Sequence, residues 1–484
     1  MTFLSADASE SALDFDSSPV NAQKLKQQPS NAEQVFYRLL EAIERQTANQ
    51  NQAFTLTLSG ENSQFVRFSR ARVRQTGEVR DGQMYLSLMS TQTGAERTVA
   101  VRLPFTAHFE TDWLELRQAL EILQADLPQV PVDPYLVLPA VLPASSQPSR
   151  SREVRLGHLL SPKAVADTLL LPVQALDFSG LYAGGTAYRA YGDSAGNRHW
   201  FETPSFTLDY SLFGDRPSQA VKGTLAGNRW SQAEYQQNIH SSQRQLDLLK
   251  RPAKSVPKGA YRTYLAPAAA ADIIDTIIWG GGLGEADLQQ GNSAFSQLES
   301  GAAQLSKQFS LGENFHRIDV PRFNESGVLA PAQLAIIEAG KWANSLVSDR
   351  SAKEYGKASN AANQTESMRA PVVAPGTLAT EQVLVQLDTG LYVSNLHYLN
   401  WSDRAAGRMT GMTRYACFWV ESGEIVAPIE NLRFDDTLYR FLGEGLVNLT
   451  DQASFVPAVD TYDRRSLGGI WTPGMLIDEF RYTL

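Results

Sequence analysis

The chain has 484 residues, of which 43% are hydrophobic, 10% aromatic and 20% charged, a composition typical of globular proteins and a length sufficient for two or three domains. Its formal net charge of −9 at pH 7 argues against a protein that mainly binds nucleic acid, because such affinity comes largely from Lys and Arg neutralising phosphates. The single cysteine, Cys417, excludes an internal disulfide and indicates a reducing compartment.

Residues 1–30 are acidic, rich in serine and poor in large apolar side chains, which predicts a disordered lead. They lack the basic and apolar regions of a secretory signal. The most apolar windows, near 169–173 and 273–279, are far shorter than the roughly 20 residues that a membrane span needs. We therefore expect a cytoplasmic protein without a membrane partner.

Residues 31–127 are predicted to form a small α+β domain. The segment NAEQVFYRLLEAIERQ has apolar residues at helical spacing, with Asn31 as its expected N-cap. Between residues 53 and 103 the period changes to two, which predicts four antiparallel strands in AFTLTLSG, QFVRFSRARVRQ, QMYLSLMS and RTVAVRLPF. Helical spacing returns in DWLELRQALEILQADL, so the domain is expected to run helix, sheet, helix.

Six prolines between 128 and 155 predict an interdomain linker. Residues 156–484 are then expected to form a larger α+β domain whose carboxy-terminal part is rich in strands. Its predicted elements are hairpins over 180–213, a helix from Ser231, an apolar helix after Pro267 and a polar surface loop over 352–376. Strands are predicted in QVLVQLDTGLYVSNLHYLNW, RYACFWVESGEIVAPIENLRF and GMLIDEFRYTL, with a hairpin turn in ESGEI.

Glycines Gly280, Gly281, Gly282 and Gly284 follow the apolar helix. A phosphate-binding loop needs glycines before a helix, together with a following lysine or a third spaced glycine. No Lys or Arg follows until Lys307, so this cluster is interpreted as the end of a helix. The local basic strip is interpreted as a solvated helix end and loop rather than a nucleic-acid site; it comprises Arg244, Lys250, Arg251, Lys254 and Lys258.

The segment GDSAG, residues 192–196, fits the G-x-S-x-G pattern of hydrolases and makes Ser194 a candidate nucleophile. That motif requires a strand that leads into a helix. Here a strand-like segment follows instead, so a hairpin turn is predicted.

The histidines are too far apart in sequence for a helical metal motif such as HExxH or HExxxH, because no two lie within five residues of each other. Each is interpreted as a surface or structural side chain; they are His108, His158, His199, His240, His316 and His397. Acidic pairs at helical spacing, such as Asp272 with Asp275 and Glu41 with Glu44, are expected to be solvated. Cys417 alternates with apolar residues and is predicted to be buried.

The segment YLAPAAAADIIDTIIWGGGLGEADLQQGNSAF resembles the central segment of the TldD/PmbA family, whose members are associated with modulation of DNA gyrase and with a zinc metallopeptidase. In the TldD branch a similar helix carries HExxxH and precedes a G-T-S-A-F-like stretch, which residues 291–295 match. The likeness is clear over about 150–484 and weak over 31–127. Other segments agree in order: SQFVRFSRARV, GTAYRAYGDSAGNRHWFETPSFTLDYSL, RFNESGVLAPAQLAIIEAGKWANSLVSDRSAKEYG and GLYVSNLHYLNWSDRAAGRMTGMTRYACFWVESGEIVAP.

The chain departs from the TldD branch at the metal helix. Alignment without gaps from Gly291 places the HExxxH positions at Thr276, Ile277 and Gly281, and a shift of one residue places them at Asp275, Thr276 and Gly280. Neither register supplies two imidazoles or the acid between them. The cysteine that the TldD branch carries near its carboxy terminus is also absent. In these respects the chain resembles the PmbA/TldE branch, which lacks the zinc motif and pairs with the catalytic subunit.

The resemblance implies the non-catalytic half of a cytoplasmic heterodimer that degrades or trims unfolded peptides. Zinc would then be held by a TldD-like partner carrying HExxxH, and no cofactor is expected in this chain. Unstructured peptides could bind by adding a strand to an open sheet edge.

Two alternatives remain open. One is an autonomous hydrolase with an unusual metal site built from Asp272, Asp275 or Glu285 and a distant histidine. The other is a homodimer that binds peptides or proteins without any enzymatic link, for example as a regulator. A link to DNA gyrase rests on the family name alone.

Overall fold

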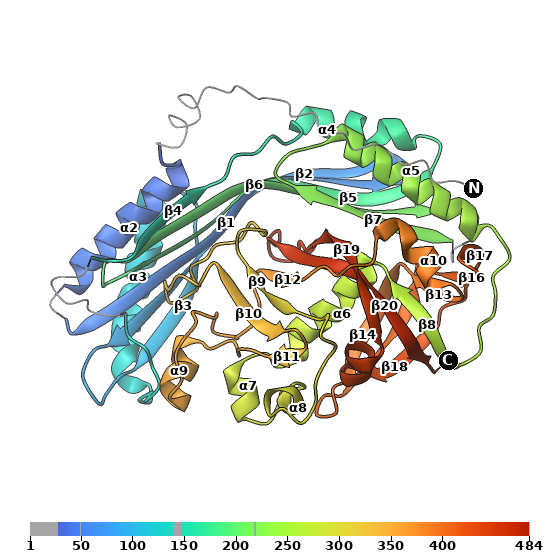
Figure 1. Ribbon diagram of the computed structural model, residues 1–484. Helices are drawn as coiled ribbons and strands as arrows, with labels where there is room; N and C mark the ends of the chain where they lie inside the picture. The colour runs from blue at the N-terminus through green and yellow to red at the C-terminus, as the bar shows by residue number, and fades with distance from the viewer. Residues whose placement is uncertain (1–27, 49, 140–146, 217–218, 484) are drawn as a thin grey trace, which may run out of the picture.

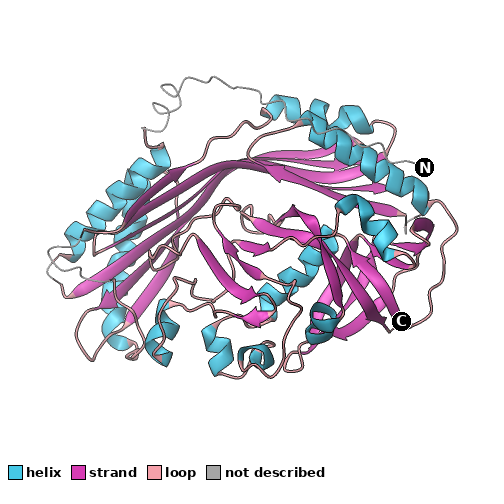
Figure 2. Ribbon diagram, in the orientation of Figure 1, coloured by secondary structure: helices cyan, strands magenta, loops and turns pink. Residues whose placement is uncertain are grey.

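The computed structural model describes residues 28–48, 50–139, 147–216 and 219–483. Residues 1–27, on which most of the predicted disordered lead falls, lie outside the described residues. A long, bent seven-stranded sheet arches over the carboxy-terminal half of the chain, and helices cover its outer face (Figure 1). Strands dominate both halves (Figure 2). The predicted α+β class is confirmed.

The amino-terminal part runs helix, sheet, helix as predicted. Its helices are α2 (Asn31–Thr47) and α3 (Phe109–Asp126). The N-cap of α2 is Ser30 rather than Asn31, because the Ser30 hydroxyl accepts a hydrogen bond from the Glu33 N–H.

The structure has three strands where four were predicted: β1 (Gln52–Ser69), β2 (Arg72–Ser90) and β3 (Thr98–Pro104). Strand β1 covers the first predicted segment and continues through Gly60 into the second. A Cβ at Gly60 would lie 2.4 Å from the ring of Tyr188, so glycine here admits a close-packed aromatic side chain within one long strand. The chain turns only at Arg70 and Ala71, which both adopt positive φ.

The sheet continues across the predicted 128–155 linker. The antiparallel partner of β1 is β5 (Asp177–Asp193), which pairs in turn with β6 (Arg198–Phe213). The far edge carries β4 (Arg150–Val154), parallel to β6, and β7 (Ala220–Gly227). Segments on both sides of the proline-rich stretch therefore contribute strands to one sheet.

Successive side chains of a strand point to opposite faces of the sheet. On the outer face, Leu56 packs beneath α2 and α3, and Phe68 packs beneath α4 (Pro162–Leu170), the turn η2 (Leu171–Val173) and α5 (Gln232–Leu249). The inner face, which includes Glu61 and Ser63, looks toward the carboxy-terminal half.

The carboxy-terminal half is built on a thirteen-stranded sheet. Its central strands are β8 (Gly259–Leu265) and β20 (Gly469–Tyr482), against which α6 (Pro267–Gly280) packs. The other strands are β9 (Leu311–Asn314), β10 (Gln333–Glu338), β11 (Lys341–Trp342), β12 (Pro371–Val373), β13 (Gly390–Val393), β14 (Asn395–Asp403), β15 (Arg408–Arg414), β16 (Phe418–Glu421), β17 (Glu424–Pro428), β18 (Arg433–Thr437) and β19 (Leu446–Pro457). Short helical segments connect them: α7 (Glu285–Gln289), α8 (Ser296–Glu299), α9 (Asp349–Tyr355), η3 (Thr380–Gln382), α10 (Val383–Leu387) and η4 (Arg440–Glu444).

Two predictions in this half are wrong. The segment QVLVQL, expected to be a strand, forms η3 and α10, because burial of Val383 and Leu387 follows a helical spacing while Val385 is exposed. The stretch 352–376 is not a loop confined to the surface. Glu366 within it is buried, and its carboxylate accepts hydrogen bonds from the N–H groups of Ala286 and Ser348.

The hairpin turn in ESGEI is confirmed. Ser422 and Gly423 connect β16 to β17 with φ of 51° and 79°, the backbone that a tight two-residue hairpin requires. No helix in the described part of the chain is both long and apolar enough to cross a membrane.

Candidate functional site

Helix α6 carries the positions that a metal motif would occupy. It begins with Pro267 at its first position, which suits the fixed φ of proline. One face is sealed in the core through Ala270, Ile273, Ile274 and Ile277. The helix ends at Gly280, as the sequence predicts for a glycine run after an apolar helix.

The structure places the degenerate metal-helix positions where they offer almost no donor atoms. Ile277 is fully buried, and Thr276 is 7% exposed with its hydroxyl donating to the Asp272 carbonyl at 2.8 Å. A Cβ at Gly281 would lie 2.5 Å from the Ile277 carbonyl oxygen, and one at Gly280 would lie 3.0 Å from Trp401 Nε1. Asp275 alone keeps a ligating side chain that is open to solvent.

These residues do not fit a zinc ion. Zinc sites in proteins use three or four Cys, His, Asp or Glu ligands, and α6 supplies one such residue in the shifted register and none in the other. Within the described ranges, no group of three or more such side chains is arranged to hold a metal.

Two carboxyls of α6 have altered proton affinity. Burial raises the pKa of Asp272 to about 7, although the Leu396 N–H, which donates to its Oδ2 at 2.9 Å, opposes this shift. Burial also raises the pKa of Asp275, with a further contribution from the negative charge of Asp460. The prediction of a solvated pair is therefore wrong for Asp272, which is half-buried and whose charge is disfavoured by its surroundings. Asp275 is exposed, as predicted, although nearby protein atoms raise its pKa.

Glu285 forms no hydrogen bond or ion pair with Asp272, Asp275 or a histidine in the described part of the chain. It lies at the start of α7 and interacts with Ser345, Gln289 and Lys357. Burial would raise its pKa, but the hydrogen bonds from these three side chains lower it overall. Glu285 is thus engaged as a structural carboxylate.

No histidine forms a hydrogen bond or ion pair with a carboxylate in the part of the chain that the structure describes. His199 is fully buried, with its ring nitrogens 2.8 Å from Ser151 Oγ and 2.9 Å from the Gly327 carbonyl oxygen. Burial lowers its pKa, as it does for His397 beside Tyr398. The structural interpretation of these two histidines is confirmed.

Ser194 lies in the hairpin turn between β5 and β6, as predicted. The Asp193 carboxylate accepts hydrogen bonds from the N–H groups of Ala195 and Asn197 and closes the turn. The Ser194 hydroxyl accepts from the Phe54 N–H at 3.3 Å. Among the described residues, no hydrogen bond links the Ser194 hydroxyl to a histidine or carboxylate that could activate it as a nucleophile.

Cys417 is 3% exposed, and its thiol donates to the Arg414 carbonyl oxygen. Burial raises the pKa of this thiol, so its predicted role as a small buried side chain is confirmed.

The basic strip is partly neutralised by its neighbours. Lys250 pairs with Asp247, and Lys254 pairs with Glu421. This supports the interpretation of a solvated helix end.

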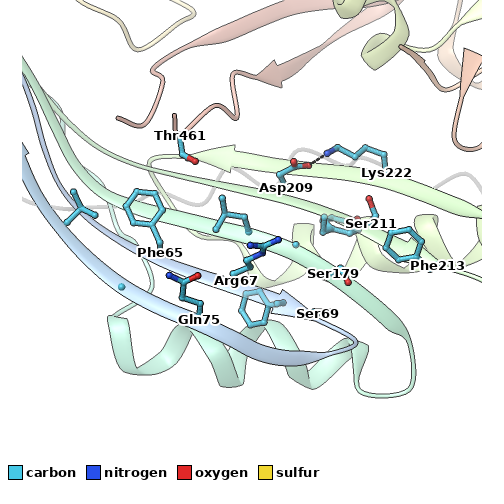
Figure 3. Close-up of a pocket in the computed structure, with 16 residues that line it drawn as sticks. Phe65, Arg67, Ser69, Gln75, Ser179, Asp209, Ser211, Phe213, Lys222 and Thr461 are labelled. Atoms are coloured by element: carbon cyan, nitrogen blue, oxygen red, sulfur yellow. Dashed lines mark ion pairs between the residues drawn. The ribbon is translucent and has the colours of Figure 1, made fainter. Parts of the chain in front are cut away.

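A cavity of about 790 Å³ on the inner face of the seven-stranded sheet was not predicted (Figure 3). Thr461, from the connection between β19 and β20, closes one side of it, and the side chains of Asp209 and Lys222 form an ion pair at another. Burial is the main influence on the pKa of Asp272 and raises it, whereas the positive charge of Lys222 makes a smaller, lowering contribution. The only available signal in the sequence was the run of polar residues on the inner face of strands that otherwise bury apolar side chains.

The comparisons with known proteins agree with the fold. Residues 258–483 match the family described as the PmbA/TldA metallopeptidase C-terminal domain. No curated protein sequence matches the chain.

Solved structures match nearly the whole chain. A candidate modulator of a DNA gyrase from Thermotoga maritima is 14% identical, with a TM-score of 0.70 over 93% of this chain and 100% of its own. TldE from Thermococcus kodakarensis is 12% identical, with a TM-score of 0.69 over 92% and 100%. A candidate gyrase modulator from Bacteroides thetaiotaomicron is 15% identical, with a TM-score of 0.69 over 92% and 98%. At these identities the likeness shows a shared fold.

The fold and the family match define a protein with a PmbA/TldA-type metallopeptidase C-terminal domain. Residues 258–483 belong to that family, and over the rest of the chain the likeness to the solved structures is one of fold.

Proposed function

We propose that this chain is the non-catalytic, PmbA/TldE-like subunit of a TldD-type zinc metallopeptidase complex that degrades or trims unfolded peptides. The observation that carries the proposal is the state of α6. Two of the positions where HExxxH would lie are glycines, Ile277 is buried, and the Thr276 hydroxyl is bonded to the backbone. Asp275 is the exception, because its carboxylate could bind a metal. A chain in this state has no means of its own to activate a zinc-bound water.

The retained fold supports a role in association and substrate handling. The likeness in fold to TldE extends over 92% of the chain, so a chain without metal ligands on α6 keeps the scaffold that such a role needs. In the seven-stranded sheet β3 pairs with β2 and ends the strand order on that side. An extended peptide could add to such an edge through main-chain hydrogen bonds, which do not depend on sequence.

Co-purification from the native cytoplasm tests the proposal. We expect the tagged chain to retain a relative that carries HExxxH, and we expect peptidase activity on a denatured protein only when both are present. The isolated chain should contain no stoichiometric zinc by elemental analysis. The matched control is the relative with its two motif histidines replaced by alanine, which should still associate but should give no activity.

Three outcomes would contradict the proposal. Failure to associate with any HExxxH relative would remove the heterodimer. One tightly bound transition metal per isolated chain would favour an autonomous hydrolase. Capture of a folded client by a homodimer, with no effect on proteolysis, would favour a binding protein without an enzymatic link.

A further inference from the structure

The cavity on the inner face of the seven-stranded sheet has a mixed lining. Its walls are apolar at Phe65, Leu181 and Phe213, and they carry hydroxyl groups at Ser69, Ser179, Ser211 and Thr461. The volume of about 790 Å³ falls in the range of sites for small ligands and far exceeds the size of an inorganic anion.

One positive charge in this cavity, on the exposed side chain of Arg67, has no hydrogen-bond or ion-pair partner among the residues that the structure describes. The charged residues among the sixteen lining residues are Arg67, Asp209 and Lys222, and Asp209 forms an ion pair with Lys222. No hydrogen bond or ion pair involves the Arg67 side chain within the described residues. Figure 3 shows Arg67 in the middle of the lining, between Gln75 and Ser179. The lining thus carries one uncompensated guanidinium.

Recognition in this cavity depends on side chains rather than on the backbone. Arg67 lies on β1, which is hydrogen-bonded to β2 on one side and to β5 on the other. Its main-chain groups are therefore engaged in the sheet, and a ligand cannot add as a further strand there. A guanidinium binds a carboxylate through two parallel hydrogen bonds, and the neighbouring apolar walls accommodate a hydrophobic body attached to that carboxylate.

We propose that this cavity binds the carboxy-terminal carboxylate of a short peptide with an apolar last side chain, through Arg67. This assignment rests on the proposed function, because it assumes that the chain binds peptides. It goes beyond that function because it places a ligand site in the subunit without metal ligands.

Calorimetric titration of the full chain with acetyl-Ala-Phe tests the assignment, with the free acid compared against the carboxamide. We expect the free acid to bind at least about 10-fold more tightly than the amide, because a charge-assisted hydrogen-bond pair is lost in the amide. Arg67→Gln should abolish this preference. The matched control is Arg74→Gln, which changes an exposed arginine on the adjacent β2 that does not line the cavity and should retain the preference.

The assignment is overturned if the free acid does not bind at millimolar concentration, or if Arg67→Gln keeps the preference for it. Displacement of the peptide by an equal concentration of inorganic phosphate would also overturn it, because the site would then recognise any anion. A chain that pairs with an HExxxH relative but shows no preference for the free acid would contradict this assignment alone. A chain that prefers the free acid but pairs with no such relative would support it and contradict the heterodimer.

Discussion

Arg465 reaches from the connection between β19 and β20 to Glu61 on the inner face of β1, and both side chains are 2% exposed. The Arg465 backbone N–H donates to Glu61 Oε1 at 3.1 Å, and its Nε donates to Ser63 Oγ at 2.8 Å. The guanidinium also donates to the carbonyl oxygens of Ser205 and Gly185. One side chain therefore joins the carboxy-terminal half to strands β1, β5 and β6.

Removal of this anchor should destabilise the whole chain. Arg465→Ala leaves the Glu61 carboxylate buried without its partner, at an expected loss of about 3–5 kcal/mol in the free energy of unfolding. Chemical denaturation measures the loss. The control is Arg464→Ala, whose side chain is 15% exposed and whose partner Asp81 is 44% exposed. Because Asp81 stays in contact with water, we expect a smaller loss of about 1–2 kcal/mol. Equal losses in the two variants would contradict the assigned role of Arg465.

The end of α6 should not accept a side chain. Gly281→Ala places a Cβ 2.5 Å from the Ile277 carbonyl oxygen, so we expect a loss of about 1–3 kcal/mol from overpacking. Gly77→Ala is the control, because nothing lies within 4 Å of its added Cβ. A fully stable Gly281→Ala variant would contradict the expectation that a Cβ clashes with the Ile277 carbonyl oxygen.

The stability of the protein should depend on pH through Asp272. Its folded-state pKa of about 7 lies above the ordinary aspartate value, so between about pH 4 and pH 7 the folded state holds a proton that the unfolded state releases. The free energy of unfolding therefore falls as pH rises through this window. Asp272→Asn keeps an oxygen acceptor for the Leu396 N–H but does not titrate. We expect the variant to gain stability relative to the native chain between pH 4 and pH 8, by about 1 kcal/mol or more.

Denaturation curves of both proteins at each pH measure this gain. Parallel pH profiles for the two proteins would show that Asp272 does not contribute to the dependence.

The thiol of Cys417 should react only after unfolding. Burial raises its pKa and its exposed fraction is 3%, so the reactive thiolate is scarce and shielded at neutral pH. We expect less than about a tenth of the chain to be labelled by iodoacetamide under native conditions, and stoichiometric labelling in denaturant. Mass spectrometry distinguishes these cases. Rapid labelling of the folded protein would contradict the assigned burial.

Elements with a strong local period were predictable. The four helices α2, α3, α5 and α6 follow from apolar spacing, and the turns at 193–197 and 422–423 follow from residues that tolerate tight backbone geometry. The failure at 382–387 shows the limit, because a short run of valine and leucine is compatible with either period and only the packing of Val383 and Leu387 selects the helix.

The candidate site also had a predictable part and an unpredictable part. The sequence alone shows that HExxxH is missing, because it shows directly that no histidine stands at these positions of α6. The raised pKa of Asp272, the engagement of Glu285 with Lys357 and the uncompensated charge of Arg67 depend on residues that are distant along the chain. No local pattern encodes these relationships.

The sequence by itself determined the family resemblance, the positions of the main helices and the lack of a helical metal motif, because each depends on residue types at short and fixed spacing. Only the tertiary structure decided that strands on both sides of the proline-rich stretch form one sheet and that Arg465 joins this sheet to the carboxy-terminal half. It also decided that Arg67, which has no ion pair among the described residues, lines a cavity beneath the sheet. These features arise from long-range packing, in which the burial and the charge of one residue depend on partners up to several hundred positions away.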